Sequence, residues 1–337
     1  MQYNMLGRTG VRVSSLCFGT MSFGGDADEP TSAAMFHRCR EAGINFFDCA
    51  NVYQSGRAEE ILGRLIADCR DAVIVTSKVH FPTGQDVNAR GSTRKHIMLA
   101  VEASLRRLNT DYLDLYFLHR FDDATPLEET LRALDDLVRQ GKVLYTGASN
   151  FAAWQVAKAL GVSAREQWTA FACIQPMYNL VKRQAEVEIL PQAQAEGLGV
   201  IPYSPLGGGL LTGKYGVERR PETGRLVSST MYQMRYGDAW VYRVAEDFAA
   251  FARERGYEPA ALAVAWVAAH PAVTAPIVGA RNVTQLEGSL RALEIPMTPE
   301  LYGEIASLSP TPPPATDRSE ERTQYNYGAQ LGAQPRR

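Results

Sequence analysis

Apolar residues follow two alternating spacings along the chain. Short, continuous apolar runs are followed by longer segments in which apolar residues recur every three or four positions, as at Leu127, Leu131, Leu134 and Val138. The runs predict strands that are buried on both faces, and the periodic segments predict amphipathic helices. Strand-then-helix units of this kind follow one another over the range Leu16–Leu290.

Eight such units and a preceding hairpin account for most of the chain. The hairpin consists of Gln2–Leu6 and Val11–Val13 around the turn Gly7–Gly10. We expect the strands at Leu16–Gly19, Asn45–Phe47, Val73–Thr76, Tyr112–Leu118, Val143–Gly147, Phe171–Ile174, Leu198–Ile201 and Ala275–Val278. We expect the helices at Thr31–Ala42, Ala58–Ala67, Thr93–Leu108, Pro126–Arg139, Ala152–Leu160, Ala185–Glu196, Pro259–Ala269 and Val283–Leu290.

This repeat predicts an α/β fold, a (β/α)8 TIM barrel with an N-terminal β-hairpin, a long loop after strand 7 and an extra C-terminal helix and tail. A doubly wound open sheet usually carries G-x-G-x-x-G after its first strand, and the segment Gly19–Gly25 lacks that spacing. The long loop is Tyr203–Trp240, and loops of this length are usually functional or disordered. We expect residues 1–309 to form a single barrel and residues 310–337 to form a Pro-rich, polar tail.

Composition and charge exclude several classes of function. The chain has 337 residues and a formal net charge of -2, without the clustered basic excess that nucleic-acid binding requires. No apolar run approaches the roughly 20 residues that a membrane span needs. The N-terminus has no basic segment followed by an apolar stretch, so no secretory signal is expected. The five cysteines are widely spaced and form no C-x-x-C pair, which favours reduced thiols in a cytoplasmic protein over disulfides or a metal site.

Four side chains that carry chemistry follow the ends of neighbouring predicted strands. They are Asp48, Tyr53, Lys78 and His119, and in a barrel they would meet at one mouth. Each also has an ordinary structural role, as a cap, a packed ring, a solvated ammonium or a core imidazole. Together they suit protonation of a developing alkoxide: the ammonium lowers the pKa of the phenol, Asp48 holds the ammonium, and His119 donates to a carbonyl oxygen.

At these residues the sequence resembles the aldo-keto reductase family, in particular the branch with bacterial general reductases and potassium-channel β-subunit-like proteins. The resemblance extends from Leu6 to about Leu308. Its motifs are Asp48–Tyr53, Ser77-Lys78, Leu118-His119, Gly147–Asn150, Gln175–Asn179 and Gly279–Asn282. It implies that Asp48, Tyr53, Lys78 and His119 are the catalytic tetrad, with Tyr53 as general acid. It also implies reversible, NADPH-dependent reduction of an aldehyde or ketone.

Polar and glycine-rich segments at later strand ends suit such a cofactor. Amide and hydroxyl groups after strands five and six can hold a carboxamide, and a Gly-rich stretch ending in Lys214 can hold a pyrophosphate, although Tyr215 departs from a nucleotide-hydrolysing P-loop. Arg281, beside a helix N-terminus, is the candidate for an adenosine 2′-phosphate. Ser289 stands where the family commonly has Asn. The predicted cofactor contacts are Gly19, Thr20, Ser149, Asn150, Gln175, Tyr203, Ser204, Leu206, Gly208, Lys214, Gly279, Arg281, Gln285 and Ser289.

Two functions stay open at this point. The first is a carbonyl reductase acting on a small molecule. The second, also implied by the resemblance, is a cofactor-sensing accessory subunit with slow residual chemistry, in which the long loop retains the cofactor. A homo-oligomer is compatible with either. The aromatic residues considered for the substrate pocket are Phe23, Phe81, Trp240 and Tyr325–Tyr327.

Overall fold

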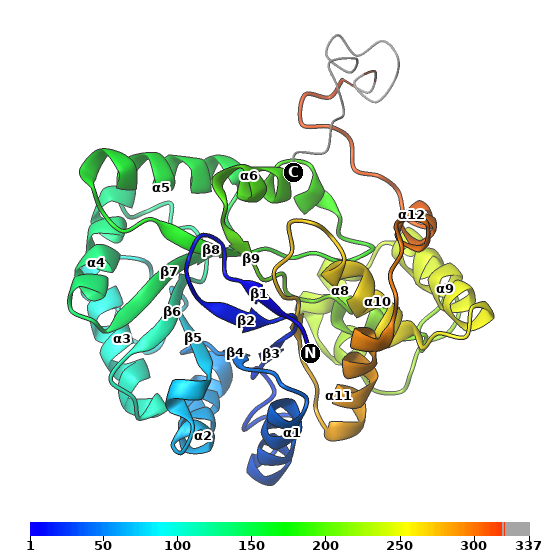
Figure 1. Cartoon of the computed structure of the whole chain (residues 1–337), viewed down its shortest axis with the longest axis horizontal. Coiled ribbons are helices and arrows are strands. Elements are labelled where there is room, and N and C mark those ends of the chain that lie inside the picture. The colour runs from blue at the N-terminus through cyan, green and yellow to red at the C-terminus, as the bar shows by residue number, and fades with distance from the viewer. Residues whose placement is uncertain (319, 321–337) are drawn as a thin grey trace.

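Eight parallel strands form a barrel at the centre of the molecule, whose computed structural model describes residues 1–318 and 320 (Figure 1). The strands are hydrogen-bonded in the order β10-β3-β4-β5-β6-β7-β8-β9. Their bounds are β3 Cys17–Gly19, β4 Phe46–Asp48, β5 Ile74–Val79, β6 Leu113–Leu118, β7 Val143–Ser149, β8 Phe171–Gln175, β9 Gly199–Val200 and β10 Ile277–Val278. All eight overlap the predicted strands.

The two ends of this sheet are joined by backbone hydrogen bonds, which close the barrel. The amide of Thr274 donates to the carbonyl of Val200 at 2.8 Å, and the amide of Ile277 donates to the carbonyl of Pro202 at 2.9 Å. The strands are almost entirely buried, because side chains fill the barrel on one face and helices cover the other. The predicted (β/α)8 TIM barrel is confirmed.

Helices surround the barrel (Figure 1). Their bounds are α1 Glu29–Glu41, α2 Arg57–Ile66, α3 Arg94–Leu108, α4 Leu127–Arg139, α5 Ala153–Glu166, α6 Ile189–Glu196, α9 Ala239–Glu254, α10 Pro259–Ala268, α11 Val283–Leu290 and α12 Pro299–Ser307. Helix α1 begins two residues earlier than predicted, because the Asp28 carboxylate accepts from the amide of Thr31 at 2.9 Å and Pro30 lies in the first turn.

The predicted hairpin covers the N-terminal end of the barrel. Its strands are β1 Tyr3–Met5 and β2 Arg12–Ser14, and they cross the middle of the barrel in Figure 1. Leu6 and Val13 are fully buried against the barrel interior. Gly7, at φ +57°, lies so close to β9 that a Cβ would stand 2.6 Å from the amide nitrogen of Gly199. Because the hairpin covers the N-terminal end of the barrel, a binding site is expected at the C-terminal end.

The connection after β9 contains three short helices. They are η4 Gly207–Thr212, α7 Arg225–Ser228 and α8 Thr230–Tyr236. Helix α9 was not predicted from the sequence, although its buried residues Val241, Ala245, Phe248 and Ala252 recur at helical spacing. The long loop is therefore an ordered insertion of short helices followed by a full helix.

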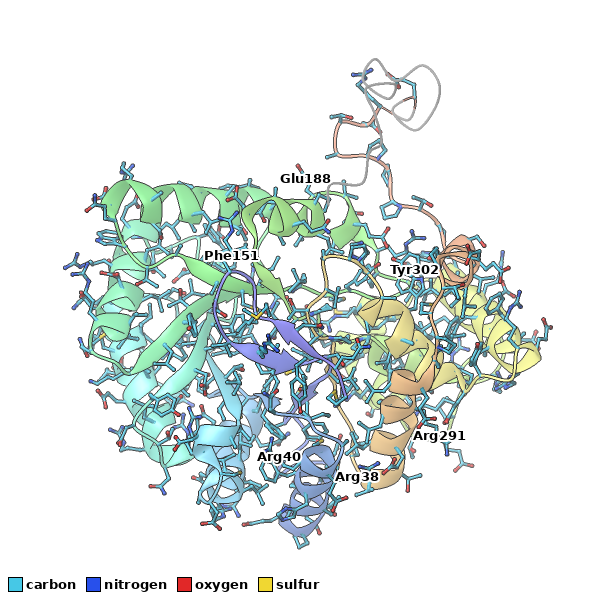
Figure 2. All side chains as sticks on the ribbon, in the orientation of Figure 1. Arg38, Arg40, Phe151, Glu188, Arg291 and Tyr302 are labelled. Atoms are coloured by element: carbon cyan, nitrogen blue, oxygen red, sulfur yellow. The ribbon has the colours of Figure 1, made fainter. Side chains whose placement is uncertain are left out.

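Side-chain contacts position the C-terminal helices α11 and α12. Arg38 of α1, labelled in Figure 2, forms an ion pair with Glu287 of α11. Tyr302 of α12 stacks on Trp266 of α10 with ring centroids 5.2 Å apart. Residues 310–318 contain no helix or strand; the predicted boundary at 309/310 stays a prediction. Within the described residues, no helix is both long and apolar enough to cross a bilayer.

Candidate active site

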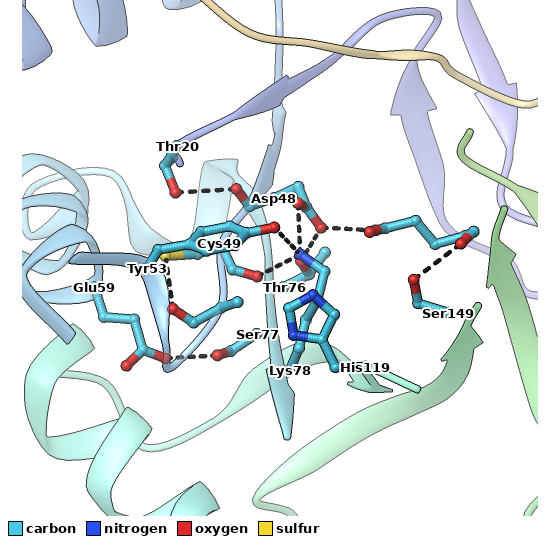
Figure 3. A network of polar contacts seen from close by, with 12 residues as sticks. Thr20, Asp48, Cys49, Tyr53, Glu59, Thr76, Ser77, Lys78, His119 and Ser149 are labelled. Atoms are coloured by element: carbon cyan, nitrogen blue, oxygen red, sulfur yellow. Dashed lines mark hydrogen bonds and ion pairs between the residues drawn. The ribbon is translucent and has the colours of Figure 1, made fainter. Parts of the chain in front are cut away.

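Three of the four predicted catalytic side chains are joined by the ammonium group of Lys78. Lys78 Nζ donates to Asp48 Oδ2 at 2.6 Å, to the Cys49 carbonyl at 2.8 Å and to Tyr53 Oη at 3.1 Å. Lys78 is fully buried and Asp48 is 2% exposed. His119 lies beside this group in Figure 3, and its ring centroid is 6.1 Å from that of Tyr53. The structure thus brings together all four residues that the sequence placed at the strand ends.

The barrel topology explains this convergence. Asp48 ends β4, Lys78 lies near the end of β5, and His119 directly follows β6. Parallel neighbouring strands bring their carboxyl ends to the same mouth. Tyr53 opens the η1 turn Tyr53–Gly56, in which Gln54 has a φ of 48° and Ser55 a φ of 55°. Left-handed conformations cost free energy in residues other than glycine, and they concentrate at functional sites.

Asp48 is held in place by groups from β5, from β8 across the barrel and from the residue that follows β3. One carboxylate oxygen accepts from Thr76 Oγ1 at 2.9 Å and from Gln175 Nε2 at 2.8 Å. Its backbone carbonyl accepts from Thr20 Oγ1 at 3.0 Å. The other carboxylate oxygen remains for Lys78, so the orientation of the ion pair is fixed from β3, β5 and β8 (Figure 3).

The titration of Tyr53 departs from the sequence-based expectation. Burial raises the pKa of Tyr53 to about 12, and the opposing effect of the Lys78 ammonium does not offset it. The expectation of a lowered pKa was therefore wrong in its net direction. Burial on its own disfavours the ammonium of Lys78, but Asp48 and Tyr53 more than compensate and raise its pKa above the ordinary value. At neutral pH the phenol is protonated and the lysine is charged.

His119 is a neutral imidazole in this site. Burial, and then the nearby Lys78 ammonium, lower the pKa of His119 well below its ordinary value. Its Nδ1 is buried without a hydrogen-bond partner in the described chain. The ring edge packs against Phe81, with centroids 4.8 Å apart, and the backbone carbonyl accepts from Asn150 Nδ2 at 2.9 Å. A neutral imidazole can donate one hydrogen bond while carrying no charge.

A second buried network lies behind Lys78, and the sequence analysis did not identify it. The fully buried Glu59 carboxylate accepts from Ser77 Oγ at 2.5 Å (Figure 3). It also accepts from Arg107 Nε at 2.7 Å. Ser77 precedes Lys78 on β5, and consecutive strand residues point to opposite faces. Glu59 therefore fastens β5 from the helix side while Lys78 points into the barrel.

Three of these four residues border a cavity of about 760 Å³ at the C-terminal mouth, and the fully buried Lys78 lies behind them. Asp48, Tyr53 and His119 contribute to its wall. So do the following predicted cofactor contacts: Gly19, Ser149, Asn150, Gln175, Tyr203, Ser204, Leu206, Gly208, Lys214, Gly279, Arg281 and Gln285. A volume of this size is typical of small-molecule and cofactor sites.

Two predicted cofactor contacts lie outside the wall. Thr20 is fully buried and bonds to the backbone of Asp48 instead. Ser289 is 1% exposed, and its hydroxyl has no partner among the described residues. Neither residue borders the cavity, and their contact with a cofactor stays a prediction. The sequence places a residue on an element but not on the face that reaches the cavity.

Of the aromatic residues predicted for the pocket, only some border the cavity. Phe81 contributes to the wall, next to His119. Phe23 is fully buried in the core against Phe18, and Trp240 is 39% exposed near the start of α9, away from the wall. Tyr325–Tyr327 lie outside the described residues.

One end of the cavity suits a nucleotide phosphate. Lys214 and Arg281 both contribute to the wall, and neither has a carboxylate within ion-pair distance in the described chain. Burial, and then the charge of Arg281, lower the pKa of Lys214, so the two cations are close enough to repel each other. A Cβ on Gly279 would meet only the Gly19 carbonyl, at 3.9 Å, which leaves room for a bound group. This end therefore favours an anion.

The opposite end suits a flat polar ring. Tyr203 Oη donates to Asn150 Oδ1 at 2.7 Å, and Ser149 Oγ donates to the Gln175 carbonyl at 2.9 Å. These groups border the same mouth as His119. The residue set as a whole fits a dinucleotide extended from Tyr203 to Arg281.

Several wall residues come from the ordered insertion and were not identified from the sequence. Arg225, Met231 and Arg235 all contribute to the wall. The only signal for them was the length of the segment, because its side chains follow no motif. Within residues 1–318 and 320, no group of three His, Cys, Asp or Glu side chains is arranged to hold a metal ion.

Comparisons with known proteins agree with this geometry. Residues 15–310 match the Aldo/keto reductase family. An uncharacterized oxidoreductase from Bacillus subtilis (strain 168) is 38% identical over 93% of this chain and 97% of its own length. A probable voltage-gated potassium channel subunit beta from Oryza sativa subsp. japonica is 38% identical over 94% and 99%. A norsolorinic acid reductase from Aspergillus flavus is 33% identical over 89% and 79%. The chain therefore belongs to the aldo/keto reductase family of oxidoreductases, whose members generally use NAD(P)H.

Proposed function

We propose that this protein reduces an aldehyde or ketone to the alcohol with NADPH, reversibly, and that Tyr53 delivers the proton. The observation that carries the proposal is the position of Lys78 Nζ, 2.6 Å from Asp48 and 3.1 Å from Tyr53. Asp48 and Tyr53 border a cavity whose other end carries Lys214 and Arg281, which have no carboxylate partner among the described residues. When bound, NADPH supplies the hydride for the carbonyl carbon. The chain supplies orientation, charge and the proton.

Tyr53 and Lys78 act as a proton donor and its stabiliser. With its pKa raised to about 12, Tyr53 holds its proton at neutral pH and can donate it to a substrate oxygen that becomes basic as the carbonyl is reduced. The phenolate left behind is stabilised by the Lys78 ammonium 3.1 Å away. Asp48 keeps that ammonium charged and oriented.

His119 positions the substrate oxygen beside Tyr53. Its pKa is lowered by burial, so it is neutral and does not compete with Tyr53 as the proton donor. A hydrogen bond from its ring to the carbonyl oxygen would polarise the carbonyl and align it with the phenol.

The remaining wall residues would hold the cofactor. Ser149, Asn150 and Gln175 suit the carboxamide, and Tyr203 suits stacking on the nicotinamide ring. The backbone of the segment Ser204–Gly209 suits the pyrophosphate. The residues that suit the adenosine end are Lys214, Gly279, Arg281 and Gln285. The unpaired Lys214 and Arg281 support NADPH over NADH, because a 2′-phosphate would neutralise both.

Tyr53→Phe tests this proposal. The variant removes only the hydroxyl, so we expect carbonyl reduction to be abolished while NADPH still binds, measured by quenching of protein fluorescence. Phe81→Leu is a control that changes an aromatic wall residue without touching the proton donor. Undiminished reduction by Tyr53→Phe would refute the mechanism.

A second candidate is a cofactor-sensing subunit. It is favoured by the ordered insertion, since Met231, Tyr232 and Arg235 of α8 border the cavity and can slow the release of a bound cofactor. The similarity to proteins named potassium channel beta subunits points the same way. A fast single turnover followed by slow steady-state turnover with every carbonyl tested would support the sensor. Equal rates in both measurements would support the enzyme.

A further inference from the structure

We propose that the substrate carries an anionic oxygen group, a carboxylate or a phosphate, which binds to Arg120 and Arg235 at the substrate half of the cavity. This inference rests on the proposed function, since it names the class of carbonyl compound that the same site would reduce. Both arginines border the cavity that contains Tyr53 and His119.

The two guanidinium groups approach the reacting end from different elements. Arg120 directly follows His119 after β6. Arg235 belongs to α8, and its guanidinium carbon is 5.9 Å from the ring centroid of Tyr203 and 5.3 Å from that of Tyr232. Tyr203 in turn donates to Asn150, which bonds to the backbone of His119. Both arginines are thus close in the structure to the residues that surround the reacting carbonyl.

Neither guanidinium has a carboxylate partner within residues 1–318 and 320. Arg70, in contrast, pairs with Asp114 at 2.7 Å. The carboxylates in the cavity wall are already committed. Asp48 binds Lys78 at 2.6 Å, and Glu258 binds Arg291 at 3.0 Å. No carboxylate of the described residues therefore balances the positive charge of this half.

The other cations of the cavity belong to a different part of it. Lys214 and Arg281 repel each other at the adenosine end. Arg225 reaches Tyr232 Oη at 3.3 Å, and Tyr232 packs against Gly208 in the Gly-rich segment proposed for the pyrophosphate. A bound cofactor would neutralise these three. Arg120 and Arg235 remain for a group on the substrate, and guanidinium donors are suited to the paired oxygens of a carboxylate or phosphate.

Apolar side chains also contribute to the wall that carries Arg120, Arg235 and Tyr53. Met21, Phe81 and Met231 border the same cavity, and Phe81 packs on His119 with centroids 4.8 Å apart. A substrate with an apolar body, a carbonyl at one end and an anionic group at the other would fit this cavity. The carbonyl would face Tyr53 and His119, the apolar body would contact the apolar side chains, and the anion would bind the two arginines.

The test compares three benzaldehydes of similar shape. They are 4-carboxybenzaldehyde, 4-formylphenyl phosphate and the neutral methyl 4-formylbenzoate, each reduced with NADPH. We expect kcat/KM to be at least about tenfold higher for one of the anions than for the ester, the size of effect of a partly exposed charge-assisted hydrogen bond. Which anion is preferred distinguishes carboxylate from phosphate.

Variants assign the preference to residues. In Arg120→Met/Arg235→Met the anion-to-ester ratio should fall to about one, and the two single variants should each lower it if the double variant folds poorly. Arg243→Met, an exposed arginine on α9 outside the cavity wall, is the matched control and should keep the wild-type ratio. A wild-type ratio of one or below, or a ratio that survives in the double variant, would overturn the proposal.

A calorimetric titration keeps this result separate from the reductase proposal. The NADPH-loaded protein is titrated with 4-(hydroxymethyl)benzoate, 4-(hydroxymethyl)phenyl phosphate and the methyl ester of the first. Tighter binding of an anion without turnover of any aldehyde would support the anionic subsite and contradict the reductase. Equal binding of all three would overturn the subsite, even if the ester aldehyde is reduced.

Discussion

Replacing Asp48 with Asn should cost more stability than any other isosteric change in the site. The substitution keeps the shape and the hydrogen bonds from Thr76 and Gln175, but it leaves the Lys78 ammonium, which is fully buried, without a counter-ion. The remaining acceptors of that ammonium, the Cys49 carbonyl and the Tyr53 hydroxyl, are uncharged. Breaking one side of a buried ion pair costs about 3–5 kcal/mol.

This cost converts into a measurable shift of the melting temperature. The entropy of unfolding is about 2.1 cal/mol/K per residue, which for 337 residues gives about 0.7 kcal/mol/K. A loss of 3–5 kcal/mol therefore lowers Tm by about 4–7 °C. Differential scanning calorimetry of Asp48→Asn at pH 7 measures it directly.

A double-variant cycle shows whether the ion pair is the cause. Lys78→Met removes the buried charge with a side chain of similar length, so Asp48→Asn/Lys78→Met contains no unpaired buried ion at this position. We expect the loss of unfolding free energy in the double variant to be about 2–4 kcal/mol smaller than the sum of the losses in the two single variants, because adjacent partners are coupled. Additive losses, or a Tm for Asp48→Asn within 1 °C of the wild type, would refute the reasoning.

Three further predictions follow from the charges of the site. The rate of carbonyl reduction should be independent of Tyr53 ionisation between pH 6 and 9, because Tyr53 loses its proton only as the pH rises through its pKa of about 12; a fall in kcat centred below pH 9 would contradict this. The folded state lowers the pKa of His119, so at a pH near or below 6.5 the unfolded state binds more protons than the folded state. The free energy of unfolding therefore falls as the pH drops through 6.5. The decrease in Tm from pH 7.5 to 5.5 should be smaller in His119→Gln than in the wild type. Arg281→Met should raise the Kd for NADPH about 10- to 100-fold and leave the Kd for NADH nearly unchanged, with Arg243→Met as the control; equal losses for both cofactors would contradict a 2′-phosphate contact.

Most of the fold was predictable because its signals are local. Continuous apolar runs mark strands that are buried on both faces, and each predicted strand overlaps an observed one. The boundary errors are also local: β5 extends to Val79 and β7 to Ser149 because polar residues at strand ends still pair in the barrel. Helix α9 was missed although its apolar spacing is regular, because the surrounding segment was interpreted as a single loop.

The candidate site was predictable for residues whose positions depend only on the order and direction of the strands. Asp48, Lys78 and His119 lie at the ends of consecutive strands, and the topology of a parallel barrel brings such ends together whatever the side chains are. That Thr20 and Ser289 do not border the cavity was not predictable, because the direction of a side chain depends on rotamer and register, which the sequence does not specify.

The amino-acid sequence by itself determined the barrel, the order of its strands and the position of Asp48, Lys78 and His119 at neighbouring strand ends. Only the tertiary structure decided the electrostatics. It buries Tyr53 deeply enough that desolvation outweighs the charge of Lys78, and it places Glu59 behind β5. It also leaves Arg120 and Arg235 without carboxylate partners in the described chain. The reason is physical: apolar periodicity is a property of neighbouring residues, whereas desolvation and ion pairing depend on residues that are distant in the sequence.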